Sequence, residues 1–310
     1  MRKLLKVPLI SISALAGIVV IGLSATSITN AVANSSEAAE LQSYSQLVEV
    51  DGKQMNVVIS GDASETIVLL PGLGTAAPGL DFEPLIAELR DDFRVVVVEP
   101  FGYGLSDQAD SPRTSENIAG EVHEALQDLE IDQYVLAGHS IAGIYALDYV
   151  NRFRDEVTAF VGIDTSVPTQ PGSDESTPTD GLAALKDLGI LRLLNSLAPD
   201  PNDGLPFDES TKRQLTILSN RNAMSPTLLD EIDRTPDNFA AARTQSFPVD
   251  LPLLLFVVAN DPELADWQQL HEEQAAGVDR GEVVPLDGGH YLHHTQSVRI
   301  AADIERFLRG

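Results

Sequence analysis

A serine in a tight strand-to-helix turn is the most reactive arrangement that this sequence offers. Residues 138–143 read GHSIAG, between the apolar run 134–137 and a helix-like pattern at 144–150. A strained turn of this kind exposes the serine hydroxyl above the sheet edge when the flanking residues are small. Gly138 and Ala142 are small, although a strict G-x-S-x-G pattern would have glycine at 142. Ser140 is therefore a candidate nucleophile.

A serine nucleophile needs a histidine to accept its proton and an acid to orient that histidine. His290 follows two glycines in a loop that precedes a helical stretch at 295–308. Asp261 lies just after the continuous apolar run 253–258, which is typical of a strand buried on both faces. Since the carboxyl ends of parallel strands meet at one edge of a sheet, the sequence predicts a triad of Ser140, Asp261 and His290.

Three further segments complete a recognisable series. Residues 67–74, IVLLPGLG, resemble a third strand and its oxyanion loop, with Pro71 where His is common. Residues 95–107, VVVVEPFGYGLSD, resemble a fourth strand followed by a Gly-x-Gly-x-Ser loop, and residues 159–164, AFVGID, resemble a sixth strand. From about Gln46 to its C-terminus the chain resembles the α/β-hydrolase superfamily.

The resemblance implies an α/β fold with a mostly parallel, doubly wound sheet. Its core would comprise residues 46–164 and 251–310, with a helical cap inserted after the sixth strand at 165–250. The alternation of strands and helices along the core favours the same arrangement. Helical patterns in the cap include 181–197, whose leucines at every third position we expect to face inward.

The resemblance also implies further site residues. The backbone N–H groups of Leu73 and Ile141 would form the oxyanion hole. Asp164 is an alternative acid, because a few members of the superfamily take the acid from the end of the sixth strand. Such a triad requires no cofactor.

The remaining histidines near the site have other interpretations. His139 is adjacent to Ser140 and should point away from it, as a packing or hydrogen-bonding residue. His293 and His294 follow His290 closely, and three histidines in five residues could suggest a metal. No cluster of acids or histidines in the sequence complements them, so we expect no metal site.

The N-terminus carries an export signal. Arg2, Lys3 and Lys6 precede an uncharged stretch with an apolar centre at 15–23, and residues 31–33 read AVA. This pattern predicts either a signal peptide at 1–33, cleaved after Ala33, or a membrane anchor at residues 7–28. Residues 34–45 are small and polar and should form a linker. The enzyme would be secreted or extracytoplasmic.

Composition excludes several classes of function. Cysteine is absent, so thiolate nucleophiles and disulfides are ruled out. The formal net charge of −27 disfavours nucleic acid as a partner and leaves the N-terminal segment as the expected route to a membrane.

These observations favour an exported serine hydrolase that cleaves a small-molecule ester or related acyl bond through an acyl-enzyme. Two alternatives stay open: a cofactor-free perhydrolase, similar to a haloperoxidase, and a non-catalytic binding protein on the same fold. Specificity resides in the cap and pocket, so the sequence does not identify the substrate.

Overall fold

The computed structural model describes residues 6–261, 264 and 266–310, which form two compact units. One unit joins the N-terminal part, up to Gln42, with Asp180–Asp203, and the other joins Ser43–Thr179 with Gly204–Gly310. The predicted cap is therefore divided between the two units, and we describe each unit by itself.

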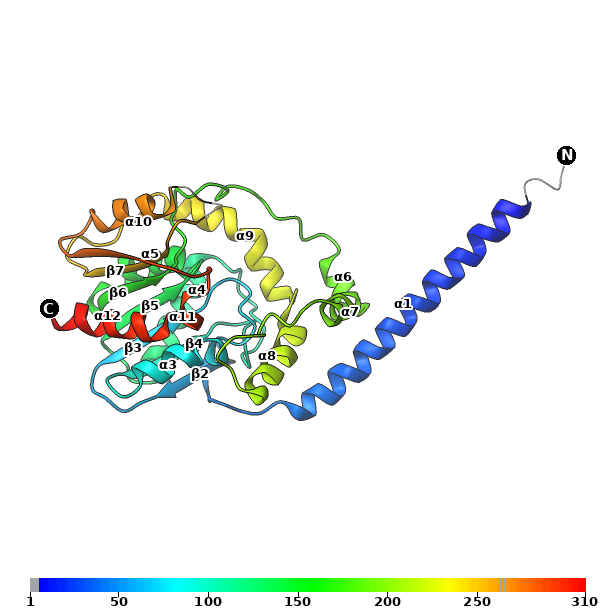
Figure 1. The fold of residues 1–310 in the computed structure, drawn as a ribbon, viewed down its shortest axis with the longest axis horizontal. Coiled ribbons are helices and arrows are strands. Elements are labelled where there is room, and N and C mark those ends of the chain that lie inside the picture. Colours follow the sequence, from blue (N-terminus) through cyan, green and yellow to red (C-terminus); the bar gives the residue numbers. More distant parts are fainter. Residues whose placement is uncertain (1–5, 262–263, 265) are drawn as a thin grey trace. The chain divides into compact units, whose positions relative to one another are not determined.

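The larger unit is built on an eight-stranded sheet in the order β1-β2-β4-β3-β5-β6-β7-β8 (Figure 1). β1 and β2 form a hairpin and pair antiparallel with each other, as do β2 and β4. All other pairs are parallel, which confirms the predicted, mostly parallel sheet of an α/β fold. The strands are β1 (Gln46–Val50), β2 (Lys53–Ser60), β3 (Thr66–Leu70), β4 (Arg94–Glu99), β5 (Tyr134–His139), β6 (Val157–Ile163), β7 (Leu253–Val258) and β8 (Gly281–Leu286).

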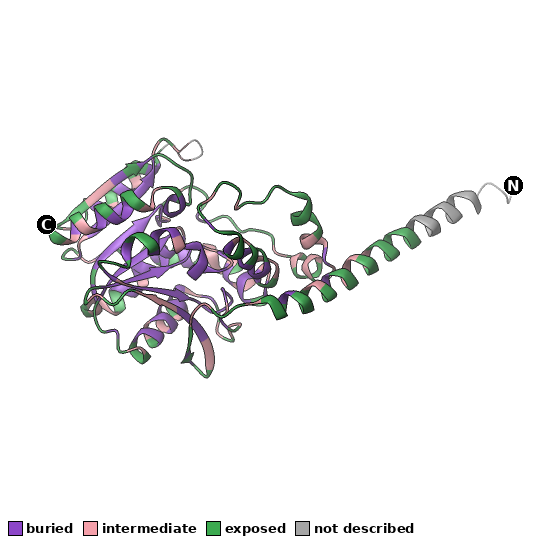
Figure 2. Cartoon of the chain, turned by 60° about the horizontal axis from the view of Figure 1, so that its bottom comes forward, coloured by how far each residue is buried: buried purple, intermediate pink, exposed green. Residues whose placement is uncertain are grey.

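Alternate residues of the strands enter two separate apolar cores, one on each face of the sheet. In β3, Val68 and Leu70 contribute to one core, whereas Ile67 and Leu69 contribute to the other. Figure 2 shows the resulting buried strands between helices with exposed outer faces. The first core is covered by α4 (Ser115–Asp128), α5 (Ala142–Arg152) and α10 (Trp267–Ala275), and the second by α3 (Glu83–Leu89), α11 (Leu292–Thr295) and α12 (Ser297–Arg309). Two short elements complete this part: α2 (Pro78–Asp81) and the 3₁₀ turn η1 (Arg154–Glu156).

Two cap helices belong to the larger unit: α8 (Glu209–Asn222) and α9 (Pro226–Ala242). Helix α9 begins at a Ser225 cap, whose hydroxyl accepts from the N–H of Leu228. The sequence alone predicts two separate helices here, at 226–234 and 238–245, because proline interrupts helices, but α9 continues through Pro236. Contacts with the core outweigh the lost hydrogen bond: Asn238 is buried, accepts from the N–H of Ser115 at 2.9 Å and donates to the carbonyl of Arg113 at 3.0 Å.

The smaller unit contains α1 (Lys6–Glu40), α6 (Leu182–Asp187) and α7 (Ile190–Leu197). Because α1 runs to Glu40, the linker predicted at 34–45 is wrong over its first part, which is helical. The single helix predicted at 181–197 is also wrong. Gly189 has a φ of 73° and separates α6 from α7, since glycine adopts the left-handed region without a Cβ penalty. No leucine of the predicted inward stripe is buried, so that prediction fails as well.

Candidate active site

Ser140 occupies a strained turn between β5 and α5. Its φ is 56°, in the left-handed region, a conformation that costs a non-glycine residue about 1–3 kcal/mol. Hydrogen bonds support the turn: the N–H of Ser140 donates to Ile163, and its carbonyl accepts from Ser166. A Cβ at Gly138 would lie 2.8 Å from the Cβ of Ala142, so the small residues at these positions are a steric requirement of the turn.

The structure brings Ser140, His290 and Asp164 into one hydrogen-bonded chain. Nε2 of His290 lies 2.8 Å from Oγ of Ser140, and Nδ1 lies 2.6 Å from Oδ2 of Asp164. A neutral imidazole protonated at Nδ1 would donate to Asp164 and accept the Ser140 proton. The His290 side chain is 46% exposed, while the Asp164 side chain is 2% exposed. The reactive pair is therefore open to a substrate, and the acid behind it is shielded from water.

Asp164 is held by several donors besides His290. It ends β6 in a turn with a φ of 47°, and its Oδ1 accepts from the N–H of Val258 at 2.9 Å and from Nε1 of Trp267 at 2.7 Å. These bonds fix the carboxylate and satisfy its buried oxygens. Trp267 begins α10, and its contribution to this site was not predicted from the sequence.

The leading prediction for the acid, Asp261, is corrected by this arrangement. Both ring nitrogens of His290 have other partners, and Asp261 accepts from the N–H of Leu264 in its own turn. The physical reason lies in the strand order, because β6 neighbours β5 directly whereas β7 is one strand further away. Asp164 also comes immediately after its strand, while Asp261 lies three positions beyond Val258.

The loop after β3 and the residue after Ser140 each supply one of the two backbone donors predicted for an oxyanion hole. Within residues 6–261, 264 and 266–310, the N–H groups of Leu73 and Ile141 donate no hydrogen bond to the protein. Backbone donors without a partner at the end of a strand and the start of a helix are suited to a developing negative charge. The predicted residues therefore have the donors that an oxyanion hole would use.

His139 supports the loop that carries His290. Its side chain is buried, and its Nε2 lies 3.0 Å from the backbone carbonyl of His290. Nδ1 faces Gly72, where an added Cβ would lie 2.8 Å away. Burial, with the neighbouring His293 and His290, lowers the pKa of His139, so the ring is neutral and donates through Nε2. The prediction that it would point away from Ser140 to make a hydrogen bond fits this position.

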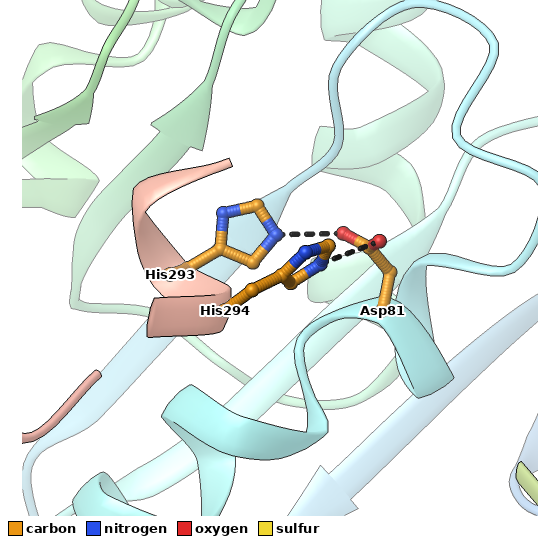
Figure 3. Close-up of side chains that lie close together, drawn as sticks. All are labelled: Asp81, His293 and His294. Carbon is orange, nitrogen blue, oxygen red and sulfur yellow. Dashed lines mark hydrogen bonds and ion pairs between the residues drawn. The ribbon is translucent and has the colours of Figure 1, made fainter. Parts of the chain in front are cut away.

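Asp81, His293 and His294 form a polar cluster behind the site (Figure 3). Nε2 of His293 lies 2.7 Å from one oxygen of Asp81, and Nε2 of His294 lies 2.9 Å from the other. Burial alone would raise the pKa of Asp81, but the two imidazoles hold it below its usual range. Sequence reasoning missed Asp81 as a partner of the two histidines, because it lies more than 200 residues before them.

These three residues could in principle ligate a metal, since their ligand atoms lie within 4.8 Å of one another. Two imidazoles and a carboxylate are a common ligand set for zinc or iron. However, each carboxylate oxygen already accepts an imidazole N–H, although Nδ1 of His293 is buried without a hydrogen-bond partner among the described residues. We interpret the cluster as a buried hydrogen-bonded link between Asp81 of α2 and the two histidines of α11.

A family assignment follows from comparison with known proteins. Residues 67–303 match the model of the Alpha/beta hydrolase family. The chain belongs to this family. Among relatives of this alpha/beta hydrolase is YbdG of Bacillus subtilis, which is 24% identical over 99% of this chain and 98% of that protein.

Two solved structures illustrate the shared fold. The enol-lactonase from Burkholderia xenovorans superposes with a TM-score of 0.62 at 19% identity, covering 86% of this chain and all of that one. A membrane phospholipase A superposes with a TM-score of 0.58 at 18% identity, covering 100% of this chain and 99% of that one. At these identities the likeness concerns the fold.

Proposed function

We propose that this alpha/beta hydrolase is an exported serine hydrolase that cleaves a carboxylic ester through an acyl-enzyme. The hydrogen-bonded chain of Ser140, His290 and Asp164 is the observation that carries the proposal. Two structural neighbours are an enol-lactonase and a membrane phospholipase A, names that describe enzymes acting on ester bonds. We further propose that the N-terminal helix α1 is retained as a membrane anchor, because it is long and apolar enough to cross a bilayer.

Each residue has one chemical task in this mechanism. Oγ of Ser140 attacks the ester carbonyl carbon while Nε2 of His290 takes the hydroxyl proton. Asp164 holds the imidazole in the required tautomer and stabilises its positive charge. The same proton then passes from His290 to the leaving alkoxide, which departs as the alcohol and leaves an acyl group on Ser140.

Water completes the cycle. It attacks the acyl-enzyme as His290 accepts its proton, and the carboxylic acid leaves as Ser140 regains a proton from the imidazole. In both steps the carbonyl oxygen becomes an oxyanion that the N–H groups of Leu73 and Ile141 stabilise. Loss of one such donor typically reduces turnover about 100- to 1000-fold.

Substitution of the nucleophile tests the proposal. Ser140→Ala should lose more than 99% of p-nitrophenyl ester hydrolysis, with roughly a thousandfold loss or greater, and should lose labelling by a fluorophosphonate probe. Ser166→Ala is the matched control, because Ser166 contacts Ser140 through its backbone N–H, which alanine retains. Equal activity of Ser140→Ala and the wild type would refute the serine mechanism.

A further inference from the structure

Helix α1 has the length and composition of a membrane span. No charged residue occurs from Val7 to Ser36, and the described part of the helix is long and apolar enough to cross a bilayer. A hydrocarbon core about 30 Å thick takes about 20 helical residues. A span that begins beside Lys6 would therefore leave the hydrocarbon near Thr26.

Two hydroxyl side chains near the end of this part of α1, those of Ser24 and Thr26, are satisfied by the helix itself. The hydroxyl of Ser24 donates to the carbonyl of Val20 at 2.8 Å, and that of Thr26 donates to Leu23 at 3.0 Å. Hydroxyl groups in hydrocarbon require such internal acceptors, because no water is available there. The helix is thus suited to lipid up to the level of Thr26.

The segment around α7 packs on α1 immediately beyond that level. Gly189 approaches α1 so closely that an added Cβ would lie 2.6 Å from the carbonyl oxygen of Thr26. The side chain of Arg192 then donates to Asn30 at 2.8 Å and to Glu37 at 2.7 and 2.8 Å. Thr26, Asn30 and Glu37 lie on one face of α1, at spacings of four and seven residues. Helix α7 is therefore held at the level where α1 would emerge from the membrane.

The face of α7 opposite Arg192 is apolar and uncovered. Leu193, Leu194 and Leu197 are 45, 56 and 77% exposed. At 100° per residue, their mean direction lies about 150° around the helix from Arg192. Since the side chain of Arg192 contacts α1, the three leucines lie on the face of α7 that is turned away from α1. Exposed apolar patches of this kind mark interaction surfaces.

From these contacts we propose that α7 lies in the lipid interface beside α1, with Leu193, Leu194 and Leu197 inserted among the acyl chains. This inference rests on the proposed anchoring by α1 and is independent of the hydrolytic chemistry. Amphipathic helices at this position insert their apolar face about 5–10 Å into the headgroup and acyl boundary. The charged residues of Asp180–Asp203 are mainly acidic, so insertion should be apolar and should persist on neutral phosphatidylcholine in high salt.

The absence of cysteine in the sequence allows this inference to be tested by site-specific labelling. Leu197→Cys would carry an environment-sensitive fluorophore on the full chain, reconstituted into phosphatidylcholine vesicles. Val298→Cys in α12 is the matched control, because Val298 is also a large exposed apolar residue, at 66%. A label at Val20→Cys, in α1, reports on the anchor separately.

We expect quenchers on the lipid chains to act several-fold more strongly at position 197 than at position 298, and aqueous iodide to act several-fold less. Equal quenching of positions 197 and 298 by iodide would overturn the inference. Protection of position 197 from both quenchers would also overturn it, in favour of a protein contact such as a second copy of the chain. A water-exposed label at Val20 would instead show that the anchor itself fails.

Discussion

His139 and His293 are imidazoles buried behind the proposed reactive pair. Burial lowers the pKa of both, and each donates through Nε2, His139 to the carbonyl of His290 and His293 to Asp81. An unfolded histidine binds a proton near pH 6.5, whereas these two resist protonation in the folded chain. The unfolded state therefore binds more protons below that pH, so stability is lost as the pH falls through 6.5 and rises again with increasing pH.

We predict that the free energy of unfolding of the full chain in detergent decreases between pH 7.5 and 5.5. Each such histidine should contribute about 1 kcal/mol per pH unit below 6.5. His139→Gln retains an N–H donor for the His290 carbonyl but cannot titrate, so urea unfolding of this variant should show a smaller decrease. An unchanged pH dependence in His139→Gln would contradict a neutral buried His139.

Sequence reasoning located two of the three proposed catalytic residues. Ser140 and His290 were predictable because small residues around a strand-to-helix turn and glycines before a histidine leave a local pattern. The acid leaves no such pattern: Asp164 and Asp261 both follow apolar strands. Asp164 differs from Asp261 in the strand order, with β6 beside β5, and in the donors Trp267 and Val258 that hold its carboxylate. Both features depend on contacts between residues distant in sequence, so sequence patterns do not reveal them.

At the level of elements, cap helix α9 is tied to the loop that carries Leu73. Oε1 of Glu231, in α9, accepts from the hydroxyl of Tyr103 at 3.0 Å and from that of Tyr145 at 2.7 Å. The Tyr103 oxygen in turn accepts from the N–H of Gly74 at 3.2 Å. Burial raises the pKa of Glu231, and the positive charge of Arg113 is the main influence that lowers it. Glu231 thereby connects the cap, helix α5 and the proposed oxyanion loop.

Removal of this connection should slow the reaction without removing a reacting group. Glu231→Ala leaves two buried hydroxyls without an acceptor, and we expect about 1–3 kcal/mol of destabilisation and roughly a tenfold lower kcat. Glu231→Gln keeps an amide oxygen for both tyrosines and should stay near wild type. The measurements are thermal unfolding and steady-state ester hydrolysis. A kcat of Glu231→Ala equal to that of the wild type would show that the loop does not depend on α9.

The core elements were predictable and the cap elements were less so. Continuous apolar runs such as 253–258 match strands buried on both faces, because each residue there enters one of two cores. In the cap, periodicity could not show that Gly189 separates α6 from α7, or that contacts of Asn238 carry α9 through Pro236. Leu193, Leu194 and Leu197 of α7 have the spacing of one helix face, yet they remain exposed.

For the whole molecule, charge and hydrophobicity are distributed unequally along the chain. The formal net charge is −27, yet residues 7–36 carry no charge at all. This distribution, a strongly acidic hydrolase unit that follows an apolar N-terminal helix, supports the proposed anchoring and export of the enzyme. The same acidity disfavours binding to nucleic acid, so the partner that we expect is a small-molecule ester.

The central claim is that Asp164, through His290, prepares Ser140 for attack. Comparison of Asp164→Asn with Asp261→Asn in ester hydrolysis tests it most directly, because both changes remove one charge with little change in volume. We predict that Asp164→Asn lowers kcat about 10⁴-fold, as loss of the required imidazole tautomer does in serine proteases, and that Asp261→Asn stays within about tenfold of the wild type. A large loss in Asp261→Asn together with near-normal turnover in Asp164→Asn would contradict the account.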